Sequence, residues 1–251
     1  MQKREKAIGF FDSGIGGLSV LQTAHRILDK ENYIYYGDSA HAPYGGRATE
    51  EILRLTETGV QVLLDRDVKA LVIACNTATA VAVEELRKRL DIPVIGMEPA
   101  VKPAIGYARQ GRILVLATPA TLRLPKFGSL VKRLNASDEI IPLPAPRLAG
   151  LVEQGDGPAI EAHLRELLAP YRTQAAAVVL GCTHYVFCRR MIGDILPDTP
   201  VLDGNEGTVL HLRDVLAERG LLNDDGGALT FLSSEPDGGA RYERIFRRAP
   251  F

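Results

Sequence analysis

The sequence predicts an α/β fold with two similar α/β domains, each with a mainly parallel sheet, related by pseudo-symmetry and holding the active site in the cleft between them. Short apolar runs alternate with segments whose apolar residues recur at helical spacing, which is typical of parallel strands joined by crossover helices. Two of these runs, residues 70–79 and 176–185, each end at a cysteine followed by small polar residues. Ligands of open α/β sheets bind beyond the carboxyl ends of the strands, so both cysteines are expected at a functional edge.

Landmarks of the two halves recur at a nearly constant offset along the chain. They are Ser13 and Thr118, 105 residues apart; Cys75 and Cys182, 107 apart; and Pro93 and Pro200, also 107 apart. Offsets that agree this closely predict two copies of one supersecondary plan. We therefore expect residues 1–98 and 206–251 to form the first α/β domain and residues 99–205 the second, with hinges near 97–102 and 204–207.

The individual elements follow from the same periodicity. The Ser13–Gly17 turn and the loop 37–46 are rich in turn formers and follow strands, so both are expected at the ligand edge. From about Asn223 the chain is rich in glycine and aspartate, and its final apolar and basic run, 242–251, is expected to pack on the first half without carrying chemistry. Strands are expected in the runs that end at Cys75 and Cys182 and at 7–12, 33–36, 92–95, 113–117, 139–143 and 200–202, with helices at 18–28, 48–65, 78–90 and 158–169.

Composition excludes several classes of protein. The chain has 251 residues, of which 46% are hydrophobic and 24% charged, and no apolar run approaches the roughly 18 residues of a membrane span. Its charged start leads into a strand pattern without a secretion signal, so a cytoplasmic protein with no membrane partner is expected. Three cysteines are too few for a disulfide framework, and a net charge of −1 gives no basic footprint for nucleic acid. A small molecule is therefore the expected partner.

Cys75 and Cys182 are the candidate catalytic residues. A single free cysteine is more often structural, but two at equivalent strand ends with polar neighbours favour function, whereas Cys188 has no counterpart and is expected to be structural. Each of the two is expected to precede a helix N-terminus, where the helix dipole and unpaired N–H groups would lower a thiol pKa. Two ionisable groups on opposite faces of one carbon can remove a proton from one side and return it from the other, which inverts a stereocentre.

Metal binding and disulfide exchange are both disfavoured. Cys75, Cys182, His184 and Cys188 offer four possible ligands, but their spacing matches none of the paired spacings of structural zinc sites. Disulfide exchange normally uses a close Cys-x-x-Cys pair. A thiol oxidoreductase stays open only if the two cysteines approach within roughly 7 Å, Cα to Cα.

The turn that begins at Asp12 admits more than one interpretation. It nearly spells Gly-x-Gly-x-x-Gly, but the last position is Ser19 and Asp12 would place a negative charge beside a pyrophosphate, so nucleotide binding is disfavoured. A helix N-terminus with Ser13 suits a carboxylate, and Asp12 could orient an ammonium group or a proton, or both could merely cap the helix. His184 is either a core histidine or the group that tunes the proton of Cys182.

Six motifs occur in order along the chain. They are FDSGIGGLSV (11–20), YGDSAHAPYG (36–45), ACNTATA (74–80), GMEPAVKPA (96–104), LVE (151–153) and GCTHY (181–185). Together they resemble the glutamate racemases, cofactor-independent enzymes of the aspartate/glutamate racemase superfamily, over residues from about 8 to about 220. The sequence differs from the family pattern at Val186, His41, Ala117 and residues 144–150.

The resemblance implies a reaction and a set of site residues. Two cysteines, one from each domain, would exchange the α-proton of glutamate without pyridoxal phosphate or another cofactor, and the D-glutamate would supply peptidoglycan synthesis. By motif, Asp12 would assist Cys75 and His184 would assist Cys182. Substrate would be bound by Asp12, Ser13, Tyr44, Gly45, Asn76, Thr77, Thr118, Thr121, Thr183 and His184, with Asp38 and Glu153 as possible auxiliary residues. Such enzymes are often homodimers, and His184 resembles the glutamate branch rather than the aspartate branch.

Two other functions remain open at this point. The same chemistry could act on aspartate or another acidic amino acid. Alternatively, the chain could be a noncatalytic protein that binds an acidic amino acid in the same cleft.

Overall fold

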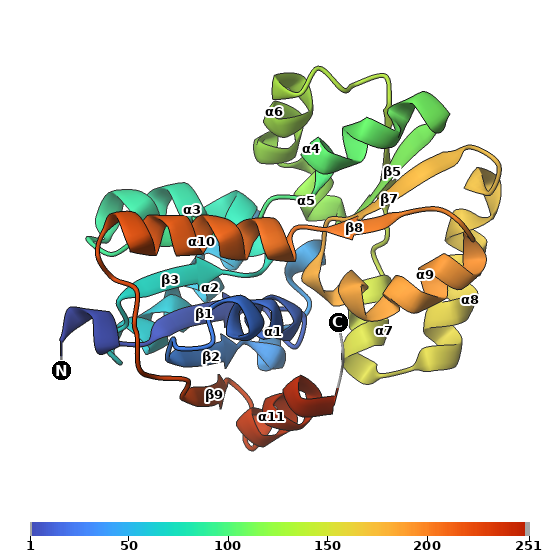
Figure 1. Cartoon of the computed structure of the whole chain (residues 1–251). Helices are drawn as coiled ribbons and strands as arrows, with labels where there is room; N and C mark the ends of the chain where they lie inside the picture. The colour runs from blue at the N-terminus through green and yellow to red at the C-terminus, as the bar shows by residue number, and fades with distance from the viewer. Residues whose placement is uncertain (1, 249–251) are drawn as a thin grey trace.

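The computed structural model describes residues 2–248 and contains two sheets, in which every strand pairing is parallel (Figure 1). The first sheet has the order β4-β3-β1-β2-β9, and its strands are β1 (Ile8–Asp12), β2 (Tyr33–Gly37), β3 (Ala70–Ile73), β4 (Val94–Gly96) and β9 (Leu229–Ser233). The second has the order β6-β5-β7-β8, and its strands are β5 (Arg112–Ala117), β6 (Ile140–Pro144), β7 (Ala175–Leu180) and β8 (Val201–Asp203). We call each sheet with its helices the first and the second lobe.

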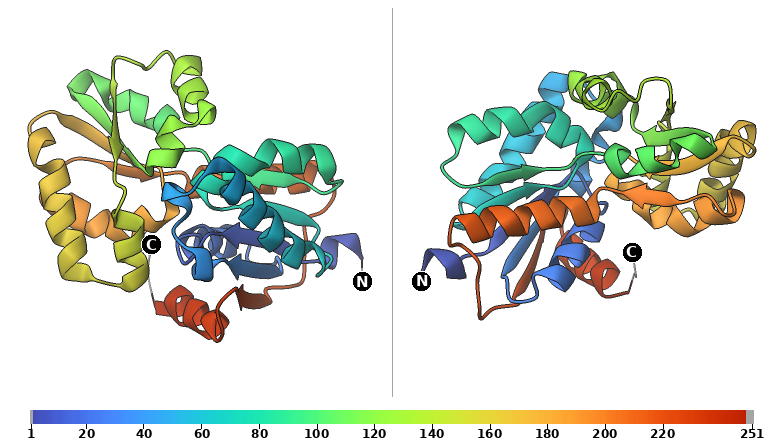
Figure 2. Two further views of the ribbon diagram at one scale, coloured as in Figure 1. Left: turned by 180° about the vertical axis from the view of Figure 1, so that it is seen from behind. Right: turned by 45° about the horizontal axis from the view of Figure 1, so that its top comes forward.

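The strand orders confirm the internal repeat. Taken from β8, the second sheet runs β8-β7-β5-β6, which matches β4-β3-β1-β2 of the first sheet strand for strand. In this correspondence β3 and β7 are equivalent, so Cys75 and Cys182 follow equivalent strands. Figure 2 shows the two lobes from behind and from above. The predicted fold class is therefore confirmed.

The first sheet is covered by helices on both faces. On one face lie α1 (Leu18–Ile27), α10 (Asn205–Glu218) and α11 (Gly238–Arg248), and on the other α2 (Thr49–Leu64) and α3 (Asn76–Arg89). Successive residues of β1 serve opposite faces, because Phe10 packs in the cluster of α1 and α10 whereas Phe11 packs in that of α2 and α3. This double cover explains why the central strands β1 and β3 are mainly apolar.

The second sheet is covered in the same way. In β5, Ile113 and Val115 pack with α4 (Val101–Ala104) and α6 (Pro125–Arg133), while Leu114 and Leu116 pack on the side of α7 (Leu148–Gln154), α8 (Gly157–Leu168) and α9 (Arg189–Ile195). The short helix α5 (Pro119–Arg123) begins directly after β5, where the Thr118 hydroxyl caps it by accepting from the N–H of Thr121.

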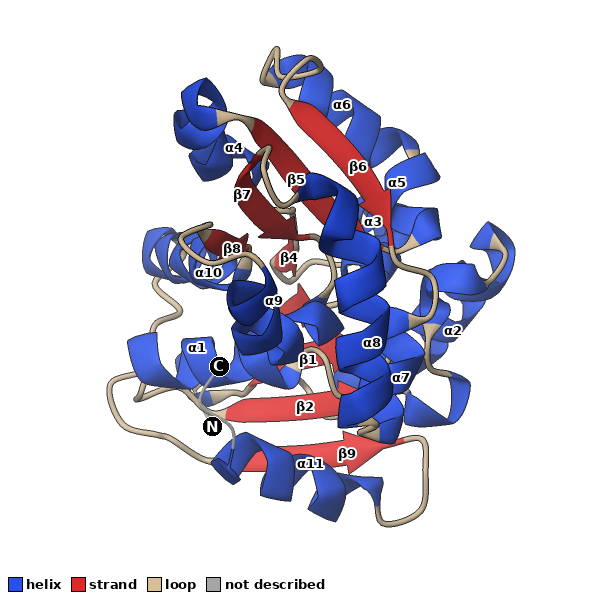
Figure 3. Cartoon of the chain, turned by 90° about the vertical axis from the view of Figure 1, so that its right-hand side faces the viewer, coloured by secondary structure: helices blue, strands red, loops and turns tan. Residues whose placement is uncertain are grey.

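The C-terminal segment differs from the prediction. It does pack on the first lobe, but it does so as a fifth strand, β9, which pairs with β2, and as the helix α11, which lies beside β9 (Figure 3). Its glycines and aspartates obscured the strand pattern. The division into domains at 98/99 and 205/206 stays a prediction. Residues 1 and 249–251, which it assigns to the first domain, lie outside the described residues.

Candidate active site

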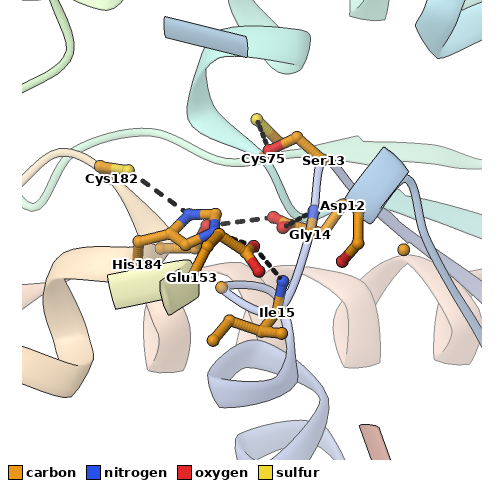
Figure 4. A network of polar contacts seen from close by, with 12 residues as sticks. Asp12, Ser13, Gly14, Ile15, Cys75, Glu153, Cys182 and His184 are labelled. Atoms are coloured by element: carbon orange, nitrogen blue, oxygen red, sulfur yellow. Dashed lines mark hydrogen bonds and ion pairs between the residues drawn. The ribbon is translucent and has the colours of Figure 1, made fainter. Parts of the chain in front are cut away.

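The loops that follow β1, β3 and β7 bring the predicted catalytic residues of both lobes together (Figure 4). Asp12 is the last residue of β1, and Cys75 and Cys182 lie two residues beyond β3 and β7. The thiol side chains are enclosed, with exposures of 5% for Cys75 and 7% for Cys182. In Figure 4 the Cys182 sulfur points toward the part of the site where Cys75 and Ser13 lie. Each lobe therefore contributes one enclosed thiol to the site.

Asp12 connects the two lobes. Its carboxylate is fully buried; Oδ1 accepts from the N–H of Gly14 at 2.9 Å, and Oδ2 accepts from the hydroxyl of Thr183 at 3.0 Å. Burial raises the pKa of Asp12, and this outweighs the opposite effects of His184 and of the two hydrogen bonds. An aspartate with a raised pKa binds a proton more readily than a free aspartate does, which suits a role in proton transfer.

Cys75 is the N-cap residue of α3, as the sequence predicted. Its sulfur accepts from the N–H of Ala78 at 3.4 Å and from the hydroxyl of Ser13 at 3.5 Å. The expected lowering of its pKa is wrong. Burial and the nearby Asp12 carboxylate raise the pKa of Cys75 to about 12, and the two hydrogen bonds only partly oppose them. The sequence could show the helix N-terminus but not the depth of burial.

Cys182 is followed by a 3-10 turn, η6 (Thr183–Cys188), and not directly by the expected α-helix. Its sulfur lies 3.9 Å from Nδ1 of His184, and Nε2 of His184 lies 2.7 Å from Oε1 of Glu153. Burial disfavours the charged imidazole, but its bonds to Cys182 and Glu153 outweigh this and hold the pKa of His184 well above its usual value. The second thiol thus has as its partner a histidine whose surroundings favour the protonated imidazole, and Glu153 bonds to the far side of that ring.

The hydroxyls of Thr77, Thr118 and Thr121 form a ring of hydrogen bonds. The Oγ1–Oγ1 distances are 3.0 Å for Thr77–Thr118, 3.1 Å for Thr77–Thr121 and 3.0 Å for Thr118–Thr121. Nearby, the amide Oδ1 of Asn76 is buried and has no hydrogen-bond partner within the described part of the chain. These four predicted binding residues therefore offer groups that can turn toward a ligand.

Asp38 and Tyr44 lie together and contact each other through their side chains. The Tyr44 hydroxyl donates to Oδ2 of Asp38 at 2.7 Å, and Nδ1 of His41 lies 2.8 Å from Oδ1. Gly45 comes close to the second lobe, because a Cβ there would lie 2.5 Å from Cβ of Thr118. We infer that this loop shapes one wall of the site.

The glycine turn allows the second lobe to approach the first. A Cβ at Gly14 would lie 1.8 Å from Oε1 of Glu153, and one at Gly16 would lie 2.4 Å from Oγ1 of Thr183. The N–H of Ile15 donates to Oε1 of Glu153 at 2.8 Å. Gly14 and Gly16, which suggested a nucleotide-binding fingerprint, instead leave room for Glu153 and Thr183 of the second lobe.

Two contacts in the site were missed by sequence reasoning. One is the backbone N–H of Ile15, and the other is Arg241 of α11, whose guanidinium lies 3.5 Å from Oε2 of Glu153. No local signal distinguishes Arg241 from Arg244, Arg247 and Arg248 on the same helix.

Two further properties of residues 2–248 bear on the class of site. No group of three or more His, Cys, Asp or Glu side chains in this range is arranged to hold a metal ion. None of the helices in the same range combines the length and the apolar character that crossing a membrane requires.

Comparisons with known proteins agree with this geometry. The family model described as Asp/Glu/Hydantoin racemase matches residues 15–212. A glutamate racemase from Clostridium botulinum (strain Alaska E43) is 44% identical over 241 residues, which cover 93% of each chain. The solved structure of a glutamate racemase isoform from Bacillus anthracis superposes with a TM-score of 0.85 at 30% identity, over 98% of this chain and 94% of that one.

A second solved structure, a glutamate racemase from Francisella tularensis in complex with D-glutamate, has a TM-score of 0.83 at 29% identity. The match covers 99% of this chain and 96% of that one. The family model spans most of the chain, and the relatives match it over nearly their whole length. The chain therefore belongs to the Asp/Glu/Hydantoin racemase family of isomerases.

Proposed function

We propose that the protein interconverts L-glutamate and D-glutamate, with Cys75 and Cys182 as the two acid–base groups. The observation that carries the proposal is the pair of equivalent thiols, one from each lobe: Cys75 is hydrogen-bonded to Ser13 and feels the charge of Asp12, and Cys182 is bonded to His184. The glutamate racemases among the relatives, one of them solved with D-glutamate, support glutamate as the substrate.

The reaction needs one proton removed from Cα and one delivered to the opposite face. In one direction a thiolate takes the α-proton and the opposite thiol donates its own, which leaves the product with inverted configuration and the protonation states of the sulfurs exchanged. The reverse direction uses the same groups in exchanged roles. No cofactor is required for this sequence of proton transfers.

On the Cys75 side, the high pKa of the thiol has to be overcome when substrate binds. The ammonium group of an amino acid placed beside Asp12 and Cys75 would favour the charged forms of both. Asp12, with its raised pKa, is suited to hold the proton that Cys75 releases. We therefore assign Asp12 to proton transfer with Cys75 and to orienting the substrate ammonium.

On the Cys182 side, the proton is shared with His184. A protonated imidazole beside the sulfur stabilises a thiolate, and Glu153 holds the imidazole through Nε2. The two sides thus use different partners, a carboxylic acid and an imidazolium, for the same task.

The remaining predicted residues are suited to bind the substrate carboxylates. Hydroxyl groups donate to carboxylates, and the side chains proposed for this are Ser13, Thr77, Thr118, Thr121 and Thr183, with the amide of Asn76. We further propose that the D-glutamate is used for peptidoglycan synthesis and that the enzyme acts in the cytoplasm. A homodimer stays a prediction.

The experiment that tests the function is racemisation in heavy water. Starting from pure L-glutamate, without added cofactor, we expect deuterium at Cα and an approach to an equal mixture of enantiomers, measured by mass spectrometry and circular dichroism. L-Aspartate under the same conditions tests the alternative substrate. Binding of glutamate without any exchange would instead support the noncatalytic binding protein.

Replacing Gly14 by alanine should lower kcat/KM for glutamate by about a hundredfold. The new Cβ would displace the Glu153 carboxylate from Ile15 and His184. Misplacing a catalytic group by about 1 Å has effects of this size. Gly150→Ala is the matched control, since Gly150 lies on α7 with Glu153 and its Cβ would meet nothing within 4 Å. Equal activity of the two variants would contradict the assigned role of the turn.

A further inference from the structure

The C-terminal helix α11 is fastened to the loops of the site. The Tyr242 hydroxyl donates to the backbone O of Gly37 at 3.0 Å and shares a hydrogen bond of 2.7 Å with the hydroxyl of Ser39. The ring of Tyr242 also packs edge-on against Tyr35, with centroids 5.4 Å apart. The Tyr35 hydroxyl in turn donates to the backbone O of Gly14 at 2.7 Å. The position of α11 is therefore fixed relative to the glycine turn.

Arg241 precedes Tyr242 and reaches across to the second lobe. Its Nη2 donates to the backbone O of Glu153 at 2.6 Å and lies 3.5 Å from Oε2 of the same residue. Glu153 is the next-to-last residue of α7, where carbonyls lack partners within the helix. A cation at this end of a helix is also favoured by the helix dipole. Arg241 thus meets both the backbone and the carboxylate of Glu153.

The carboxylate of Glu153 is held from three separate segments. Oε1 accepts from the N–H of Ile15 at 2.8 Å and lies 2.7 Å from Nε2 of His184, which leaves Oε2 facing Arg241. The Glu153 side chain is 12% exposed and that of Arg241 is 35% exposed, so the carboxylate is largely shielded from solvent while the guanidinium is partly exposed. Removing Arg241 would take this partner away from both Oε2 and the backbone O of Glu153.

We propose that Arg241 is a positioning residue of the racemase: by holding Glu153 it directs His184 toward the sulfur of Cys182. The proposal rests on the assignment of the Cys182 side in the proposed function. It also gives α11 a role in the reaction, although this helix contributes no group that touches the reacting atoms.

The charged groups around Glu153 predict how the activity depends on pH. The ionisable groups that face it are Asp12 on β1, Tyr35 on β2, His184 on η6, and Arg241 and Tyr242 on α11. Burial raises the pKa of Glu153, but the bonds to His184 and Ile15 and the charge of Arg241 outweigh it and lower the pKa below its usual value. Without Arg241 the pKa of Glu153 rises, and the carboxylate also loses the contact that positions it against His184, whose pKa falls when the bond to Glu153 is weakened.

The test compares Arg241→Met and Arg241→Lys with Arg244→Met. Arg244 is an exposed residue of the same helix, so its substitution removes the same charge away from the site. We expect Arg241→Met to lower kcat/KM for glutamate by roughly tenfold to a hundredfold and to move the acid limb of the pH profile to higher pH. Arg241→Lys should recover part of the loss, because it keeps the charge without the planar fork. Arg244→Met should behave as the wild type.

A second measurement separates this proposal from the proposed function. The titration of His184, followed by NMR of its ring nitrogens, should show a lower pKa in Arg241→Met than in the wild type, whether or not the protein racemises glutamate. If the wild type did not racemise glutamate, the proposed function would be overturned. The titration of His184 would still test the role of Arg241. An unchanged His184 titration, an unchanged kcat/KM, or a loss of activity that is equal at every pH would overturn the positioning role.

Discussion

Replacing Cys75 by serine is expected to lower the rate of glutamate racemisation by about 10²- to 10⁴-fold, and the same change at Cys182 should have an effect of the same order. A serine hydroxyl is a far weaker acid than a thiol, so one face of Cα loses its proton donor and acceptor. The fall in kcat/KM must be equal from both enantiomers, because their equilibrium constant is unity. Circular dichroism from each pure enantiomer measures both directions.

The two variants should nevertheless differ in hydrogen exchange. The remaining thiol can still remove the α-proton of one enantiomer and return solvent deuterium to the same face, so each variant should label a different enantiomer. Cys188→Ala is the matched control, because this thiol is also buried but lies at the end of η6, six residues beyond Cys182, and has no assigned role in the reaction. Full activity in Cys75→Ser or Cys182→Ser would exclude the two-thiol mechanism.

Replacing Lys69 by methionine should lower the free energy of unfolding by about 3–5 kcal/mol, the usual effect of removing one partner of a buried ion pair. Lys69 and Glu31 are both about 1% exposed and form an ion pair, and Nζ of Lys69 also donates to the backbone O of Leu221 at 2.8 Å. Burial lowers the pKa of Lys69, against the effect of Glu31. Urea unfolding measures the change.

Lys69 immediately precedes β3, whereas Cys75 follows that strand, so the pair lies at the opposite end of the strand from the thiol. The folded fraction of Lys69→Met should therefore keep its KM for glutamate. Lys88→Met is the control, since Lys88 pairs with Glu85 on the surface and its loss should leave the free energy of unfolding nearly unchanged. Equal unfolding midpoints for the two variants would contradict a stabilising role for the buried pair.

The pattern of the sequence was sufficient to predict every described strand except β9, and the position of both thiols. A buried parallel strand appears as a continuous apolar run, so the ends of β3 and β7 could be placed within two residues from residues 70–79 and 176–185. The repeat offset then predicted that both cysteines follow equivalent strands. These inferences succeed because they depend only on local periodicity and on the parallel topology.

Properties that depend on distant segments could not be predicted in this way. The pKa of Cys75 depends on how deeply the second lobe buries it, and the role of Arg241 depends on a contact with a residue 88 positions away. Lys69 likewise depends on a distant segment, because its partner Glu31 lies 38 residues earlier in the chain. Local sequence carries no signal for such contacts.

The position of β9 and α11 also determines the order in which the two lobes can fold during synthesis on the ribosome. The strands of the second sheet occupy one continuous stretch, residues 112–203, and can pair before the last segments have been translated. The first sheet has to wait for α10, β9 and α11, which at about 5–20 residues per second emerge over several further seconds. The amino-terminal lobe, although synthesised first, is therefore the last to be completed.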